Sequence, residues 1–167
     1  MIRNATPADA VAIAALYDYY VRETVITFEL DPVPAEEIAR RITSVQELNL
    51  PWLVTEEDGE VVGFAYASPY RPRAAYVHSV EVSIYLRHGI QGRGVGGALY
   101  RELLARLREL PVHLALSLVA LPNDASVALH ERLGFTFAGT FTEVGRKFDQ
   151  WIDVGHWQLP LSHEITS

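Results

Sequence analysis

A glycine-rich segment in the middle of the chain has the residue types that bind a phosphate group. It reads Gln91-Gly92-Arg93-Gly94-Val95-Gly96-Gly97 and lies between a predicted strand and a predicted helix. Glycine permits close approach of the backbone, so several amide N–H groups can point at one anion. The N-terminus of the following helix adds roughly half a positive charge. The segment therefore predicts a phosphate or pyrophosphate site, and the alternative is a turn that only packs a helix.

Two familiar phosphate-binding patterns do not explain this segment. Gly92, Gly94 and Gly97 have the spacing of the dinucleotide fingerprint, which needs an acidic residue about 20 positions further on to hold a ribose. No Asp or Glu lies between Leu110 and Asn123. The Gly-Lys-Ser/Thr sequence of a Walker loop is also absent from the segment. A different phosphate ligand is therefore expected.

Two titratable side chains are candidates for proton transfer. Glu81 lies in an otherwise apolar predicted strand, where partial burial would raise the pKa of its carboxyl group toward the range of a general base. The alternative is an outward-facing strand residue. His130 titrates near neutral pH and lies four residues after Ser126 on a predicted helix, so the two side chains share a face. A helix-surface histidine is the alternative, and no acidic residue with clear spacing supports a Ser–His nucleophile.

Composition limits the class of protein. The 167 residues suffice for one compact domain, expected to span 1–167. The absence of cysteine excludes a disulfide framework, a Cys-ligated zinc site and a cysteine acyl-enzyme. The net charge of −7 disfavours a nucleic-acid partner. No signal peptide or membrane-length apolar run is visible, and the histidines lack metal-ligand spacing, so we expect a cytoplasmic protein without metal or membrane contact.

Periodicity and turn residues predict the elements that must position these side chains. Helices are predicted to begin at Thr6-Pro7 and at Pro34, to span Gly94–Glu109, and to run from Asn123 to Gly134. Strands are predicted over Trp52–Thr55, Val61–Ala67, Tyr76–Leu86, His113–Ala120, Phe135–Phe141 and Trp151–Gln158. This order favours an α/β fold with a mixed sheet and packed helices, and it excludes a regular βαβ repeat.

Two motifs in this order resemble those of the GNAT superfamily of N-acetyltransferases. Gln91-x-x-Gly94-x-Gly96 resembles its pyrophosphate-binding motif, and the stretch from Asn123 to Gly134-Phe135 resembles its later Asn…Gly-Phe segment. Other segments resemble the phosphinothricin/methionine-sulfoximine acetyltransferase branch, and together they extend from near residue 25 to 158. They are Thr27-Phe28-Glu29, Arg73-x-x-Tyr76, Val80-Glu81-Val82-Ser83-Ile84-Tyr85 and the stretch from Glu143 to Gln158.

This resemblance implies a GNAT fold, with a mostly antiparallel central sheet flanked by helices. It also implies transfer of an acetyl group from acetyl-CoA, as co-substrate, to the α-amine of a small amino-acid-like substrate such as phosphinothricin, methionine sulfoximine or methionine sulfone. We expect direct transfer in a ternary complex, and members of the branch are typically homodimers. Acetylation of a protein N-terminus or lysine, and an acyl-CoA-binding sensor without turnover, are the alternatives.

The resemblance further implies a role for each matched position. The backbone of Ile84, Tyr85 and Leu86 would pair with the pantetheine arm of acetyl-CoA, and Asn123, with Ser126 nearby, would meet its thioester end. The pyrophosphate would be held by Gln91, Gly92, Arg93, Gly94, Val95, Gly96 and Gly97. Substrate contacts are expected from Phe28, Glu29, Arg73, Tyr76 and Lys147, although Arg73 could instead belong to a solvated turn. His130 occupies the place of a tyrosine that protonates the departing thiolate in many GNAT enzymes.

Overall fold

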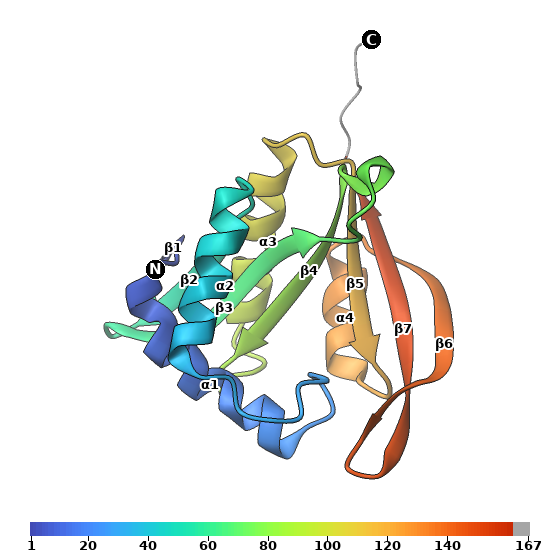
Figure 1. The fold of residues 1–167 in the computed structure, drawn as a ribbon, viewed down its shortest axis with the longest axis horizontal. Helices are drawn as coiled ribbons and strands as arrows, with labels where there is room; N and C mark the ends of the chain where they lie inside the picture. The colour runs from blue at the N-terminus through green and yellow to red at the C-terminus, as the bar shows by residue number, and fades with distance from the viewer. Residues whose placement is uncertain (162–167) are drawn as a thin grey trace.

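A computed structural model describes residues 1–161, which form seven strands and four α-helices around one sheet (Figure 1). The helices are α1 (Ala10–Glu23), α2 (Ala35–Glu47), α3 (Val95–Arg108) and α4 (Asp124–Arg132). The strands are β1 (Ile2–Asn4), β2 (Trp52–Glu57), β3 (Glu60–Pro69), β4 (Ser79–Leu86), β5 (Leu114–Ala120), β6 (Thr136–Lys147) and β7 (Gln150–Pro160). None of the helices within 1–161 is long and apolar enough to cross a membrane.

The sheet has the order β1-β2-β3-β4-β5-β7-β6, and all neighbouring strands are antiparallel except β4 and β5. The predicted mostly antiparallel α/β sheet is therefore confirmed. The parallel pair is short, because only Ser79–Glu81 of β4 meet Leu114–Leu116 of β5. Beyond these residues the two strands spread apart, and Figure 1 shows the gap widening toward the C-terminal end of each strand.

Each face of the sheet carries its own core, because successive side chains of a strand point to opposite faces. On one face, α3 buries leucines such as Leu99 and Leu103 against sheet residues that include Leu53. On the other face, α1 and α2 bury Ile13 and Ile42 against Trp52 and its neighbours. Two helices therefore cover each side, with α1 and α2 in front and α3 and α4 behind in Figure 1.

Three boundaries differ from the sequence prediction. The chain begins with a strand, β1, which was missed because three residues at a sheet edge show no periodicity. The strand predicted from Tyr76 begins only at Ser79, because Ala74–Tyr76 form a 3-10 turn. The predicted strand Phe135–Phe141 continues to Lys147, where a two-residue turn with left-handed Phe148 and Asp149 (φ 51° and 58°) closes the β6–β7 hairpin.

Candidate active site

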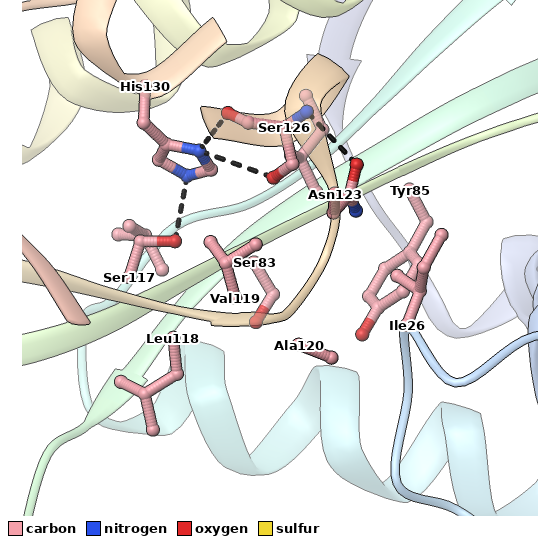
Figure 2. Close-up of a pocket in the computed structure, with 12 residues that line it drawn as sticks. Ile26, Ser83, Tyr85, Ser117, Leu118, Val119, Ala120, Asn123, Ser126 and His130 are labelled. Carbon is pink, nitrogen blue, oxygen red and sulfur yellow. Dashed lines mark hydrogen bonds between the residues drawn. The ribbon is translucent and has the colours of Figure 1, made fainter. Parts of the chain in front are cut away.

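The divergence of β4 and β5 leaves a narrow cavity of about 50 Å3 in the middle of the sheet (Figure 2). It is lined by residues of β4, β5, α4 and the connection between α1 and α2. These are Ile26, Val82, Ser83, Ile84, Tyr85, Ser117, Leu118, Val119, Ala120, Asn123, Ser126 and His130. Five of the predicted site residues outside the glycine segment therefore meet here, and they are Ile84, Tyr85, Asn123, Ser126 and His130.

The backbone of β4 presents alternate residues to this gap. The Arg87 N–H donates to the Val62 carbonyl (2.7 Å) and the Tyr70 N–H donates to the Ser79 carbonyl (3.2 Å), so odd-numbered residues of β4 face β3. The main-chain groups of Ile84 and Leu86 consequently point toward the gap, as expected of residues that pair with an added chain. Tyr85 differs from the prediction, because its main chain faces β3 and its side chain lines the cavity.

The carbonyl of Leu86 already has a partner within the protein. The Tyr20 hydroxyl, from the last turn of α1, donates to it over 2.5 Å. Of the two outward-facing residues, Ile84 therefore has both main-chain groups directed at the gap without this competition. A bound chain that pairs with Leu86 as well must share its carbonyl with Tyr20.

The predicted phosphate loop has the backbone geometry that its glycines allow. Gly92 and Gly94 have φ of 84° and 82°, a left-handed conformation that residues with a Cβ rarely adopt. Gly94 is the N-cap of α3, and the Ala98 N–H donates back to its carbonyl (3.1 Å). The preceding amides of Val95, Gly96 and Gly97 belong to the first turn, where N–H groups have no intrahelical acceptor. They can therefore bind an anion together.

Gly96 serves a packing purpose instead. A Cβ at this position would lie 3.0 Å from Cδ1 of Leu86, so its absence lets α3 lie close to β4. The two long polar side chains of the loop are engaged with its neighbours: the Arg93 guanidinium pairs with Glu57 (3.2 Å), and the neutral Gln91 accepts at Oε1 from the Gly89 N–H (2.8 Å). Exposed pairs of this kind contribute little stability, so an anion can compete for Arg93.

His130 is a buried histidine, with 2% of its surface exposed, and the surface alternative is wrong. Its Nδ1 lies 2.7 Å from the Ser126 carbonyl, which can only accept, so Nδ1 carries the proton. Nε2 then accepts from the hydroxyls of Ser117 (2.7 Å) and Tyr100 (2.9 Å), as Figure 2 shows for Ser117. Burial lowers the pKa of His130. The arrangement therefore favours a neutral imidazole.

Two partners of His130 escaped the sequence analysis. Ser117 is a single hydroxyl residue inside the apolar run of β5, and Tyr100 is one aromatic residue among the leucines of α3. Both are buried, and burial raises the pKa of Tyr100. Polar residues in apolar runs were the available signal, but only the fold shows that one histidine joins them. The three side chains hold α3, α4 and β5 together behind the cavity.

Asn123 stands at the start of α4, where it both caps the helix and lines the cavity. Its Oδ1 accepts from the Ser126 N–H (3.1 Å), which makes it the N-cap of the helix. The same residue lines the cavity (Figure 2). The predicted helix start is therefore confirmed.

Glu81 lies where the gap begins. It is paired with Leu116 on the last rung that joins β4 to β5. Because Val80 and Val82 belong to the core beneath α3, Glu81 points to the other face of the sheet. Burial raises the pKa of its carboxyl group, while the charges of Arg71 and His156 oppose this change. The structure thus places Glu81 and His130 at the same gap but on opposite faces.

The predicted substrate residues come from three segments, namely the turn before β4, the connection between α1 and α2, and the end of β6. Arg73 begins the 3-10 turn before β4, and Tyr76 ends it with its ring against Tyr70 (5.5 Å between centroids). Glu29 pairs with Arg41 of α2 (2.8 Å). The Phe28 ring packs against Gly145 of β6, and the Lys147 ammonium donates to the Thr27 carbonyl. These two residues therefore join the α1–α2 connection to the end of β6. Within 1–161, no group of three or more His, Cys, Asp or Glu side chains is arranged to hold a metal ion.

Residues 2–156 match the sequence model of a protein family described as "Acetyltransferase (GNAT) domain". The chain belongs to the GNAT family. It is an N-acetyltransferase, and its sheet with a parallel pair that splits apart is the GNAT fold. The resemblance inferred from the glycine segment and the Asn…Gly-Phe segment is thereby confirmed.

Relatives of this GNAT enzyme carry specific names. A phosphinothricin N-acetyltransferase of Streptomyces coelicolor is 40% identical, over 96% of this chain and 95% of the relative. An L-methionine sulfoximine/L-methionine sulfone acetyltransferase of Pseudomonas aeruginosa is 34% identical, over 96% and 94%. A GNAT superfamily phosphinothricin acetyltransferase of Sinorhizobium meliloti, solved in complex with AcCoA, has a TM-score of 0.94 and 34% identity, covering 100% of this chain and 91% of that one.

Proposed function

We propose that the chain acetylates the α-amine of a small amino-acid-like substrate, of the phosphinothricin, methionine sulfoximine or methionine sulfone type, by direct transfer from acetyl-CoA in a ternary complex. The names of the relatives support this substrate class. The observation that carries the proposal is the position of Glu81, at the last paired rung before β4 and β5 separate. A base at that point lies beside the place where an extended acyl donor would enter the sheet.

The residues present fit acetyl-CoA. The outward-facing main chain of Ile84, with Leu86 beyond it, is an unpaired strand edge that an extended amide chain can join. The first-turn amides of α3 and the left-handed Gly92 and Gly94 suit the pyrophosphate. Asn123 and Ser126 would lie at the thioester end, next to the cavity. Acetyl-CoA supplies an activated acyl group, and the protein supplies its alignment.

The amine must lose a proton to attack. An α-amino group has a pKa near 8, so most of it is protonated at neutral pH. Glu81, directly or through one water molecule, would accept that proton while the amine nitrogen bonds to the carbonyl carbon and the carbon–sulfur bond breaks. The leaving thiolate then takes up a proton. Partial burial of Glu81 favours this role, because it moves the pKa of the carboxyl toward the working pH.

The geometry supports a proton-donating role for His130 less directly than it supports Glu81 as the base. Its Nε2 accepts two hydrogen bonds, so proton donation would require a second proton on a buried ring. We propose that any proton it gives to the thiolate passes through the Ser117 hydroxyl, which lines the cavity. Its other contribution is to hold Ser117 and the first turn of α4 in place. The neutral tautomer makes this second contribution independent of pH near neutrality.

On the substrate side, we propose that Arg73 binds the α-carboxylate and that Tyr76, Phe28 and Glu29 border the amino acid. Arg73 is exposed at the head of its turn, and a guanidinium can take a carboxylate in two parallel hydrogen bonds. Phe28 is 42% exposed, so part of its ring is free to contact a bound ligand. Arg71 adds a second positive charge near Glu81.

We also propose a homodimer. The β6–β7 hairpin, at one edge of the sheet, exposes a row of large apolar side chains, and a second copy of the chain would cover them. They are Phe137 (58%), Phe141 (58%), Val144 (56%), Phe148 (53%) and Trp151 (62%). The cytoplasmic location stays a prediction.

Thiol release from acetyl-CoA by the purified protein tests the function. The panel contains phosphinothricin, methionine sulfoximine, methionine sulfone, ordinary amino acids and a lysine peptide. Turnover with the first three that is lost in Arg73→Ala supports the proposal. Turnover with the peptide alone would move the function to protein acetylation. Binding of CoA without turnover on any acceptor would refute the proposed reaction.

A further inference from the structure

Lys147 is a buried cation with an unusual set of partners. Only 3% of its surface is exposed, although it stands at the end of β6, one residue before the hairpin turn. Its ammonium donates to the carbonyls of Thr27 (2.9 Å) and Tyr20 (3.4 Å), and it lies 5.1 Å from the centre of the Phe148 ring. A buried ammonium is costly unless its donors are satisfied. The contacts that satisfy Lys147 are mainly main-chain groups more than a hundred residues away.

These partners give the ammonium a favourable field. Tyr20 lies in the last turn of α1, where carbonyls have no intrahelical donor and the helix dipole is negative. The Tyr20 carbonyl also accepts from the Thr24 hydroxyl (2.8 Å), at the residue that ends the helix. Burial lowers the pKa of the Lys147 ammonium, and the charge of Glu29 opposes this change. Lys147 therefore caps α1 from another part of the chain.

The segment that follows α1 also packs against the β6–β7 hairpin. A Cβ on Gly145 would lie 2.3 Å from Cε2 of Phe28, so the phenylalanine ring rests directly on the glycine. Two residues earlier, Ile26 lines the cavity between β4 and β5. Thr27, between them, receives the Lys147 hydrogen bond and contacts the Tyr17 hydroxyl through its own (2.5 Å). The segment 24–29 is thus fastened to β6 at two points, beside the cavity.

We propose that Lys147 is a positioning residue for the acyl acceptor. It ties segment 24–29 to the β6–β7 hairpin and so sets the place of Ile26 at the cavity and of Phe28 against Gly145, without touching the substrate itself. The inference rests on the proposed function for its kinetic consequence, but the fastening of the segment can be measured without turnover. It differs from the sequence expectation, which placed Lys147 among the residues that contact the substrate.

The first test removes the ammonium and keeps an unbranched side chain that is one atom shorter. Lys147→Met should raise the KM for the amine acceptor roughly tenfold, the effect of losing about 1.4 kcal/mol of positioning, and leave the KM for acetyl-CoA within about twofold. Arg146→Met is the matched control, because Arg146 is the preceding residue of the same strand and points outward to pair with Asp149 (3.4 Å). The control should change neither KM.

Hydrogen–deuterium exchange supplies the readout that does not depend on the reaction. In Lys147→Met, amides of 24–29 should lose protection while those of β3 and β4 keep theirs. If the wild-type protein shows no turnover but Lys147→Met still loses amide protection over 24–29, the proposed function is refuted. The inferred role of Lys147 in holding this segment then stands. Unchanged protection and unchanged KM values in Lys147→Met would overturn the inference.

A second variant keeps the test decisive if Lys147→Met does not fold. Gly145→Ala leaves the buried charge in place and forces the Phe28 ring to move, because the added carbon would overlap it. We expect a smaller change of the same kind, a threefold to fivefold rise in the acceptor KM with acetyl-CoA binding unchanged. A purely structural role would instead lower the melting temperature with both KM values unaltered, and that result would also overturn the inference.

Discussion

Glu81→Gln separates the chemistry of the site from its stability. The substitution keeps the size and polarity of the side chain and removes only the carboxylate that we assign as the base. Glu81 makes no ion pair within 4.0 Å among residues 1–161, so the change should not leave a charged partner unsatisfied. Its neighbours across the rungs are Ser68 and Leu116, and both accommodate a glutamine.

Two magnitudes follow from the position of Glu81. Loss of an aligned base costs about 10²–10⁴-fold in rate, so kcat should fall by that factor. Stability should move the other way. Because burial raises the pKa of the folded carboxyl above its unfolded value, the ionised group at neutral pH disfavours the folded state, by about 1.4 kcal/mol for each tenfold weakening of the acid. Glutamine carries no such cost, so the melting temperature should stay equal or rise.

The pH profile of kcat/KM completes the test. In the wild type we expect an acid limb above the ordinary carboxyl pKa of 4.5, where Glu81 becomes protonated, together with a second limb from the amine of the substrate near pH 8. Glu81→Gln should keep only the amine limb. The assay is thiol release from acetyl-CoA at saturating cofactor. If the variant keeps kcat within threefold and retains the acid limb, Glu81 is not the base.

Three further predictions address two residues that line the cavity and one that lies near Glu81. His130→Ala should lower the free energy of unfolding by about 2–4 kcal/mol along with activity, measured by urea unfolding, because it leaves a cavity and the buried hydroxyls of Ser117 and Tyr100 without their acceptor; an unchanged stability would contradict the network. Asn123→Ala should lose about 1 kcal/mol through the helix cap, whereas Asn123→Asp should keep the cap and raise only the KM for acetyl-CoA; equal acetyl-CoA KM values in Asn123→Asp and the wild type would argue against a thioester contact. His156→Phe should move the acid limb to higher pH, because the charge of the imidazole lowers the pKa of Glu81; a limb that stays in place would show that this charge is not felt.

The sequence determined the parts of the site that follow from local rules. The glycine-rich segment predicted a turn between a strand and a helix, and the structure has that turn, with Gly92 and Gly94 left-handed and α3 following. Asn123 predicted a helix start, and its side chain caps α4. Both features depend on a few consecutive residues, so they can be inferred without knowledge of the rest of the fold.

What escaped the sequence depends on long-range packing. The direction of Tyr85, whose main chain pairs with β3, follows from the register of two strands and not from its own segment. His156 was set aside as a scattered histidine, yet it lies near enough to Glu81 for its charge to act on the carboxyl. Its ring also packs against Phe141 (4.4 Å between centroids). Neither relation can be inferred from the residue types of the local segment.

The most consequential feature of this kind is the point at which β4 and β5 part. Apolar patterning predicts both strands, but it does not reveal that their pairing ends at Glu81 and Leu116. That end point gives one strand two different uses. Up to Glu81, β4 is a core strand held on both sides, and after it the outward main chain of Ile84 borders a cavity. The carboxyl group of Glu81, at the last paired rung, has a pKa raised by burial and still lies next to the gap. In the mechanism that we propose, the split of the sheet would therefore both make room for the acyl donor and place the base beside it.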